Sequence, residues 1–352
     1  METQYTRRIE NIEAVLVQYL NECPDPAWTA RIFPGLENRI STESVAALTA
    51  PGWDLLSRGG KRWRPLLMTL VCESLGGADA ALPLAPLVEL PHTASLIHDD
   101  IEDNSDERRG KPAVHIIHGV DAAINGGSFL YFLPLRCINP WGDKIVKEYH
   151  VPAEVLAERK NKIYALWGEY MQKLHLGQAM DIHWHRDFSS LPCLDEYYTM
   201  CGLKTGCLAR FAASLGVCAA AAVNTIPEAE LGERLGNAAE NLGVGFQILD
   251  DVKNLTTGIP GKKRGDDVAE GKKSLPVLMY LHRRPDKQEF VARCFAAARD
   301  RGTSAPETET LIGELAAAGI LQEAAEQGLA LIKKARGEFD GPDIAGLFEL
   351  IS

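Results

Sequence analysis

The sequence predicts an all-α protein, a single large helical bundle in which residues 1–352 form one domain. Apolar residues recur every three or four positions, as one face of a helix requires, in windows such as 9–20, 194–203 and 233–249. We find no convincing series of alternating strands and no repeat of roughly 20–50 residues. Helices therefore account for the regular structure.

Breaking residues divide these helices. Proline, glycine and charged residues gather at 134–152, 187–192 and 256–271, which we interpret as surface stretches. None of them resembles a long disordered linker, which favours one domain over two.

Composition excludes several classes of protein. The net charge of −11 argues against general nucleic-acid binding, because the phosphate backbone would be repelled. The eight cysteines form no CxxC pair, which is typical of reduced thiols in a cytoplasmic protein. The N-terminal segment has neither the apolar run of a signal peptide nor the composition of a transit peptide. We expect no membrane span.

An acidic stretch follows the apolar segment 86–98. If the helix continues, Asp99 and Asp103 lie one turn apart on one face, with Asp100 beside them. Carboxylates so placed repel each other. Mg²⁺ removes that cost, because it takes one or two carboxylates and completes its shell with water and phosphate oxygens. The alternative is a solvated acidic helix end.

Two arginines follow these acids. Arg108 and Arg109 precede Gly110 and Pro112, which suggests a fixed turn that presents them. Arginine binds phosphate through two parallel hydrogen bonds. Carboxylates beside arginines indicate a site for a metal and a diphosphate, although a surface charge-pair loop is the alternative.

A second acidic pair supports this interpretation. Asp250 and Asp251 again follow an apolar helical run. Asn254 shares a face with Asp250, and Gln247 lies about one turn before it. If the two acidic helix ends face each other, they can hold a polyanion through several metal ions.

Basic residues occur at several further places. Singly, each cluster can be a solvated face, but together they supply the positive charge that an anionic substrate needs. Lys204 is notable because an apolar stretch surrounds it, and a buried lysine needs a partner. The other residues are Lys61, Arg62, Arg64, Lys262, Lys263, Arg264, Lys272 and Lys273.

These motifs, taken in order, resemble those of the trans-isoprenyl diphosphate synthase (polyprenyl synthetase) family. The matching segments are GGKRWRP, HTASLIHDDIEDNSDERRGKPAVH, GQAMD, KTG, FQILDD and GKKRGDDVAEGKKSLP, within residues 59–276. DDIEDNS, LHLGQAMDIHW and DDVKN are most similar to geranylgeranyl diphosphate synthases of the eukaryotic type. In that group the second motif commonly ends in asparagine, as it does here at Asn254.

The resemblance implies a Mg²⁺-dependent prenyltransferase whose bundle has a central cavity and holds three ions per active site. It implies that Mg²⁺ binds directly to Asp99, Asp103 and Asp250, with support from Asp100 and Asp251. The implied allylic diphosphate ligands are Arg108, Lys204, Lys262 and Lys272. The implied isopentenyl diphosphate ligands are Lys61, Arg64, His92 and Arg109. Thr205 and Gln247 would turn oxygen dipoles toward a carbocation, and Gln178, Asp181 and Asn254 would line the site.

The histidines separate into two groups. His92 lies in the matching segment HTASLIHDD, which favours a substrate role over that of a core histidine. His98 has no such support. His183 and His185 lack an evident third metal ligand, so we interpret them as solvated or structural.

The implied reaction follows from charge. Departure of the allylic diphosphate leaves a carbocation, which the double bond of isopentenyl diphosphate attacks before a proton is lost. No dedicated general base is evident, so we expect the departing diphosphate to accept that proton. Water must be excluded from the cation, and residues 256–271 are a candidate lid.

Product length depends on the helix before Asp99. Ala94 and Ser95 lie about one turn before it and are small, whereas in this family a large aromatic residue there stops growth at fifteen carbons. We expect a product of twenty carbons. Phe129, Tyr131 and Phe132 are candidates for the floor, by which we mean the closed end of the pocket that holds the growing chain. Pro91 can kink this helix and reshape the pocket wall.

Three alternatives remain open at this point. A longer-chain polyprenyl synthase shares every motif. A terpene cyclase also ionises a diphosphate but does not need the isopentenyl diphosphate ligands. A non-catalytic synthase subunit usually lacks one aspartate motif. The expected partners are isopentenyl and allylic diphosphates and further copies of the chain, in a homodimer or a higher homo-oligomer.

Overall fold

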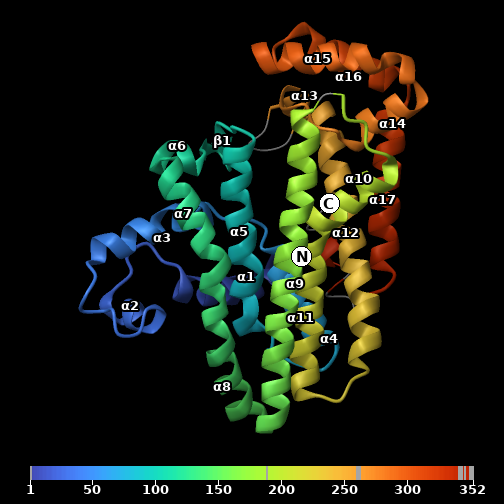
Figure 1. Ribbon diagram of the computed structural model, residues 1–352. Helices are drawn as coiled ribbons and strands as arrows, with labels where there is room; N and C mark the ends of the chain where they lie inside the picture. The colour runs from blue at the N-terminus through green and yellow to red at the C-terminus, as the bar shows by residue number, and fades with distance from the viewer. Residues whose placement is uncertain (1, 188, 259–262, 340–343, 345, 349–352) are drawn as a thin grey trace. The chain divides into compact units, whose positions relative to one another are not determined.

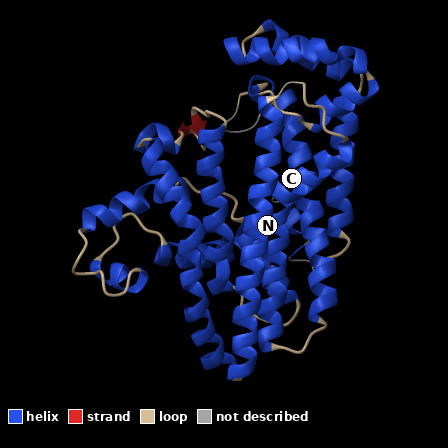
Figure 2. Ribbon diagram, in the orientation of Figure 1, coloured by secondary structure: helices blue, strands red, loops and turns tan. Residues whose placement is uncertain are grey.

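The computed structural model describes residues 2–187, 189–258, 263–339, 344 and 346–348. Lys262, to which a substrate role was assigned, lies outside these residues. Helices make up 79% of the structure. Within the described residues the strands are two residues each, β1 (Glu107–Arg108) and β2 (Lys111–Pro112). Figure 2 shows strand in red at one place, among helices in blue. The all-α prediction is confirmed.

Contacts between Cα atoms divide the chain into two compact units. Unit 1 contains residues 1–168, 211–236 and 340–351, and unit 2 contains residues 169–210, 237–339 and 352. Each unit is described by itself below. The assignment of one domain to residues 1–352 stays a prediction.

Unit 1 is built mainly from the first half of the chain (Figure 1). Its helices are α1 (Glu2–Tyr19), α2 (Pro26–Ile32), α3 (Thr42–Ser57), α4 (Trp63–Ser74), η1 (Leu82–Leu84), α5 (Ala85–Glu102), α6 (Val114–His118), α7 (Val120–Phe132), η2 (Leu133–Cys137) and α8 (Ile138–Tyr149). Three long helices contribute to both units, α9 (Ala153–Arg186), α11 (Cys207–Val223) and α12 (Glu228–Thr256).

Unit 2 contains the remaining helices. They are α10 (Leu194–Cys201), η3 (Gly202–Gly206, a π-helical turn), α13 (Asp266–Glu270), α14 (Leu275–Arg283), η4 (Pro285–Lys287), α15 (Gln288–Arg301), α16 (Pro306–Ala317) and α17 (Ile320–Arg336). Its core includes Tyr197 from α10, Ile248 from α12, Leu278 from α14 and Phe295 from α15, none more than 1% exposed.

Helix α5 is the central element of unit 1. Leu87, Leu90 and Ile97 are fully buried on it, and it packs beside α7 (Figure 1). The helix continues through Pro91 to Glu102. Proline cannot donate the usual backbone hydrogen bond, but tertiary burial on both sides of Pro91 keeps the helix in one piece.

One predicted surface stretch contains a helix that was not expected. Residues 134–152 are mostly helical, because α8 occupies Ile138–Tyr149. Pro140 lies in the first turn of α8, where a helix tolerates proline because the N–H there has no intrahelical acceptor. Trp141 is fully buried and donates to the carbonyl of Ala80 at 2.8 Å. This buried anchor fixes one face of α8, while Lys147 and Glu148 on its other side stay exposed.

One helical stretch, Leu194–Val223, is long and apolar enough to cross a membrane. However, 78% of its apolar window is buried inside the protein, as in the core helix of a soluble protein. The cysteines behave as predicted, because all are free thiols and only Cys23 and Cys193 are exposed.

Candidate active site

The first aspartate motif ends α5. The helix stops at Glu102 and Asp103 is its C-cap, with its N–H bonded to the carbonyl of Asp99 at 2.9 Å. Asp99 and Asp103 are therefore one turn apart, as predicted, and both are partly exposed. The side chain of Asp100 is 0% exposed.

A β-hairpin presents the two arginines. Glu107 pairs with Pro112 and Arg108 with Lys111, so Arg109 and Gly110 form a two-residue turn. Their φ angles of +56° and +74° are those of a type I′ turn, which favours glycine. Arg58, whose side chain is 1% exposed, donates to the carbonyl of Arg108 at 2.9 Å. The predicted fixed turn is present.

Arg108 binds the acids of the preceding helix. Its Nε donates to Oδ1 of Asp100 at 2.8 Å, and its Nη2 lies 3.4 Å from Oδ2 of Asp99. Burial alone would lower the pKa of Arg108, but Asp100, Asp99 and Asp103 together raise it. The guanidinium thus stays charged beside the carboxylates, where it can also bind a diphosphate oxygen.

A second group of basic residues lies in the same unit. Nη1 of Arg64 is 3.3 Å from Nε2 of His92, and its guanidinium lies over the ring of Trp63. Arg109 donates to the carbonyls of Leu55 and Gly59. Lys61 is exposed in the turn before α4.

His92 is held neutral in this group. Burial, and then the charges of the surrounding arginines, keep its pKa well below the usual value. Those arginines are Arg64, Arg109, Arg62 and Arg108. A neutral imidazole can accept a hydrogen bond as well as donate one, so His92 can orient an arginine and bind a substrate oxygen.

Sequence reasoning missed the support of this group. Arg62 is buried and bonds Glu89 at 2.7 Å and Glu13 at 2.6 Å, so its role is structural. Glu89 is 2% exposed, and a lone acid inside the apolar stretch 86–98 was the signal that a buried partner exists.

The candidate floor residues differ in environment. Ala94 is fully buried, and Ser95 bonds the carbonyl of His92 at 2.9 Å. Tyr131 stacks on His98, with ring centroids 5.8 Å apart. Phe129 stacks on Phe33, whereas Phe132 is 62% exposed.

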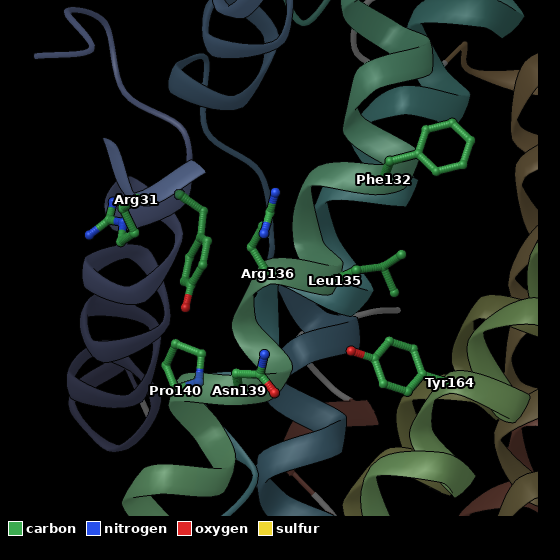
Figure 3. Close-up of a pocket in the computed structure, with 8 residues that line it drawn as sticks. Arg31, Phe132, Leu135, Arg136, Asn139, Pro140 and Tyr164 are labelled. Atoms are coloured by element: carbon green, nitrogen blue, oxygen red, sulfur yellow. The ribbon is translucent and has the colours of Figure 1, made fainter. Parts of the chain in front are cut away.

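Phe132 lines a separate pocket of unit 1 (Figure 3). This pocket has a volume of about 530 Å³. Its walls are formed by Tyr19, Arg31, Phe132, Leu135, Arg136, Asn139, Pro140 and Tyr164. The aspartates and the basic residues of the candidate site do not line it.

In unit 2 the second aspartate motif lies on α12, as predicted. Asp250 is partly exposed and Asp251 is 1% exposed. One oxygen of Asp251 accepts from Tyr197 Oη at 2.8 Å and from the backbone N–H of Leu275 at 3.3 Å. The other accepts from Gln247 at 2.9 Å and Lys272 Nζ at 3.1 Å. Asp251 is therefore an anchor for four partners.

Lys272 lies among acids. Its Nζ is 3.6 Å from Asp267, in addition to its bond to Asp251. Burial lowers the pKa of Lys272, but Asp251, Asp267 and Asp181 outweigh it and hold the pKa well above the usual value. Lys272 is therefore fully charged at neutral pH and suited to bind an anion.

The KTG segment forms the π-helical turn η3. Such turns are frequent at functional sites. Lys204 pairs with Asp181, which is 2% exposed and also contacts His185 at 2.8 Å. Burial opposes ionisation, but Lys204 and His185 hold the pKa of Asp181 well below the usual value. His185 is buried against Asp181, so of the two expected roles the structural one stays the prediction.

Two further predicted residues meet beside this turn. The hydroxyl of Thr205 donates to Oε1 of Gln247 at 2.9 Å. Gln178 lies on α9, one turn before Asp181, and is partly exposed. Gly177 permits close packing here, because a Cβ at this position would lie 2.4 Å from the backbone nitrogen of Lys204.

The acidic donors fit Mg²⁺. Asp99 and Asp103 offer two partly exposed carboxylates one turn apart, and Asp250 offers another in unit 2. Among the described residues no group of three or more His, Cys, Asp or Glu side chains forms a closed metal cage. Mg²⁺ does not need one, because water and substrate phosphates complete its shell.

Comparisons with known proteins agree with this chemistry. Residues 45–309 match the family model described as polyprenyl synthetase. The geranylfarnesyl diphosphate synthase of Aeropyrum pernix is 33% identical over 69% of this chain and 73% of its own. A geranylgeranyl pyrophosphate synthase of Penicillium canescens is 34% identical over 73% of this chain and 70% of its own.

A solved structure supports the fold. The crystal structure of a geranylgeranyl pyrophosphate synthase aligns with a TM-score of 0.79 and 23% identity, over 100% of this chain and 99% of that one. At this identity the likeness concerns the fold alone. The family match covers far more than half of the sequence. The chain therefore belongs to the polyprenyl synthetase family of prenyltransferases.

Proposed function

We propose that this protein condenses isopentenyl diphosphate with dimethylallyl, geranyl or farnesyl diphosphate to give a trans-prenyl diphosphate, chiefly geranylgeranyl diphosphate. One observation carries this proposal. Each aspartate motif pairs a buried carboxylate with a charged basic side chain, Asp100 with Arg108 and Asp251 with Lys272. Both motifs thus combine acids for metal with cations for diphosphate.

The metal supplies part of the chemistry. The family depends on Mg²⁺ in general, and three ions bound near Asp99, Asp103 and Asp250 would neutralise charge on the diphosphate. Asp100 and Asp251 are buried, and we expect them not to bind a metal directly. They act by orienting Arg108 and Lys272, with which they form ion pairs.

The protein's own groups act on the leaving diphosphate. The C–O bond of the allylic substrate breaks and both electrons leave with the diphosphate, whose charge Arg108, Lys204 and Lys272 stabilise. The double bond of isopentenyl diphosphate then forms the new C–C bond. The proton that is lost passes to the departed diphosphate, which balances the reaction.

The second substrate needs its own cations. Arg64 and Arg109, with Lys61 and the neutral His92, form the proposed site for isopentenyl diphosphate. Arg64 and Arg109 are each oriented by a neighbour, His92 for the first and the carbonyl of Leu55 for the second. Thr205 and Gln247, joined by a hydrogen bond, are proposed to stabilise the carbocation by their dipoles.

Product length separates two versions of this proposal. Ala94 and Ser95 are both small, so we expect that the wall near Asp99 does not stop growth at fifteen carbons. We propose twenty carbons. A longer product is the alternative, and the Aeropyrum pernix relative is named for geranylfarnesyl diphosphate.

A product assay tests the proposal. Purified protein is incubated with Mg²⁺, labelled isopentenyl diphosphate and each allylic primer in turn, and the products are sized by mass spectrometry. A dominant twenty-carbon diphosphate supports the proposal, and longer products would correct the length only. Absence of condensation with every primer would exclude the synthase and favour a cyclase or a non-catalytic subunit.

We also propose a cytoplasmic homodimer. Apolar residues of the neighbouring helices α6 and α7 on unit 1 are about half exposed, namely Ile116, Ile117, Val120 and Ile124. A second copy of the chain would cover this face. Light scattering of the purified protein checks the proposal, and a monomeric mass at micromolar concentration would contradict it.

A further inference from the structure

We propose that Asn254 is a positioning residue and not a metal ligand. It holds the segment 263–272 in place and thereby fixes the position of the Lys272 side chain. This inference rests on the proposed function and deepens it. The sequence pattern alone places Asn254 at the end of an aspartate motif, one turn after Asp250, where a role toward substrate or metal is the natural expectation.

The contacts of Asn254 point to the chain segment that follows. The residue is 1% exposed. Its Oδ1 accepts from the backbone N–H of Asp267 at 3.1 Å, and its Nδ2 lies 3.5 Å from the carbonyl of Lys263. Its own carbonyl accepts from the N–H of Gly265 at 2.9 Å. Both ends of the amide therefore bind the backbone of one segment.

That segment ends at Lys272. The N–H of Lys272 donates to the carbonyl of Asp267 at 2.8 Å. The carboxylate of Asp267 also faces Lys272 Nζ at 3.6 Å. Asn254 thus fixes Asp267, and Asp267 fixes both the backbone and the charged end of Lys272.

The far end of the same segment has a second support. Nη2 of Arg299 donates to the carbonyl of Glu270 at 3.2 Å and to the carbonyl of His185 at 2.9 Å. The short helix α13 is therefore tied near both of its ends. Asn254 is the support that reaches it from the aspartate motif.

The chemistry of this position requires an amide. A carboxylate can accept from the Asp267 N–H, but it has no N–H to offer the Lys263 carbonyl. It would also be an ion in a place that is 1% exposed, which costs free energy without a cationic partner. An aspartate at 254 would therefore disturb the segment rather than strengthen metal binding.

The test uses Asn254→Asp, which changes only the amide, and Asn254→Ala, which removes both contacts without adding charge. Both variants should raise the KM for the allylic primer about tenfold, as a misplaced binding group does, with a smaller change in kcat. The Mg²⁺ concentration for half-maximal rate should stay unchanged. Hydrogen–deuterium exchange is measured in the absence of metal and substrate. Over residues 263–272 it should be faster in both variants than in the wild type.

Two comparison variants separate the explanations. Asp250→Asn should shift the Mg²⁺ midpoint and leave exchange over 263–272 unchanged. Asn237→Asp makes the same substitution at an exposed position of α12 and should change neither readout.

Two outcomes would overturn the inference. One is a shifted Mg²⁺ midpoint with unchanged exchange in either Asn254 variant, which would make Asn254 a metal ligand. The other is unchanged exchange with an unchanged KM. If the wild-type protein shows no condensation, the proposed function fails, but the exchange measurement still decides the role of Asn254.

Discussion

The two aspartate motifs share a plan but differ in how the buried acid is held. In each, the first aspartate is partly exposed and the second is buried. Asp100 is paired with one guanidinium, from a hairpin eight residues later. Asp251 has Tyr197, Gln247, Lys272 and a backbone N–H as partners.

The residues one turn after the first aspartate differ as well. Asp103 is a partly exposed helix cap, whereas Asn254 is buried. The first motif therefore depends on local neighbours and the second on contacts from several helices. We therefore expect the two similar sequence patterns to differ in their sensitivity to substitution.

The largest expected effect is at the second motif. Asp251→Asn leaves Lys272, whose side chain is 15% exposed, without its nearest carboxylate. It also replaces one of the two acceptor oxygens, and each of these oxygens has two donors. Loss of one partner of a buried ion pair destabilises a protein by about 3–5 kcal/mol. Urea denaturation measures this free energy of unfolding, and Asp195→Asn, at an exposed position of α10, is the control.

The matching change at the first motif should cost less. Asp100→Asn leaves Arg108 with Asp99 at 3.4 Å, and only one side chain loses its acceptor. This pair is as buried as that of Asp251 with Lys272, but fewer partners are lost, so we expect a loss of about 1.5–3 kcal/mol. A loss equal to that of Asp251→Asn would remove the proposed difference between the motifs.

The next effect concerns the packing around the KTG turn. A methyl group in Gly177→Ala would lie 2.4 Å from the backbone nitrogen of Lys204, so α9 and η3 must separate. Overpacking of this kind costs about 1–3 kcal/mol, and thermal unfolding should show a lower midpoint.

The same helix supplies a matched control. Gly168→Ala, also on α9, meets no atom within 4 Å, and alanine is the better helix former by about 0.5–1 kcal/mol. This variant should be slightly more stable than the wild type. A similar loss in both variants would show that α9 rejects alanine for reasons other than the contact with Lys204.

Much of this was predictable from sequence. Helical spacing was enough to place Asp99 and Asp103 one turn apart, and Gly110 with Pro112 indicated a turn beside the arginines. Residues 134–152 were not predictable as helix, because a proline in a first turn reads like a breaker until the burial of Trp141 is known. The partners of Asp251 were also hidden, since Tyr197 is 54 residues away and carries no local signal.

The smallest effect concerns the basic group of unit 1. Burial and the nearby arginines hold the pKa of His92 well below the usual 6.5. As pH falls below about 6.5, unfolded chains take up a proton that the folded protein does not. Stability is therefore lost on acidification, by at most about 1.4 kcal/mol per pH unit.

Replacement of this histidine should remove that part of the pH dependence. His92→Gln cannot titrate, so its free energy of unfolding should fall by about 1 kcal/mol less than that of the wild type between pH 6.5 and about pH 5.5. His150→Gln, at an exposed position, should keep the wild-type slope. Parallel slopes for all three proteins would mean that His92 is protonated in the folded state, and the arginines would then not hold it neutral.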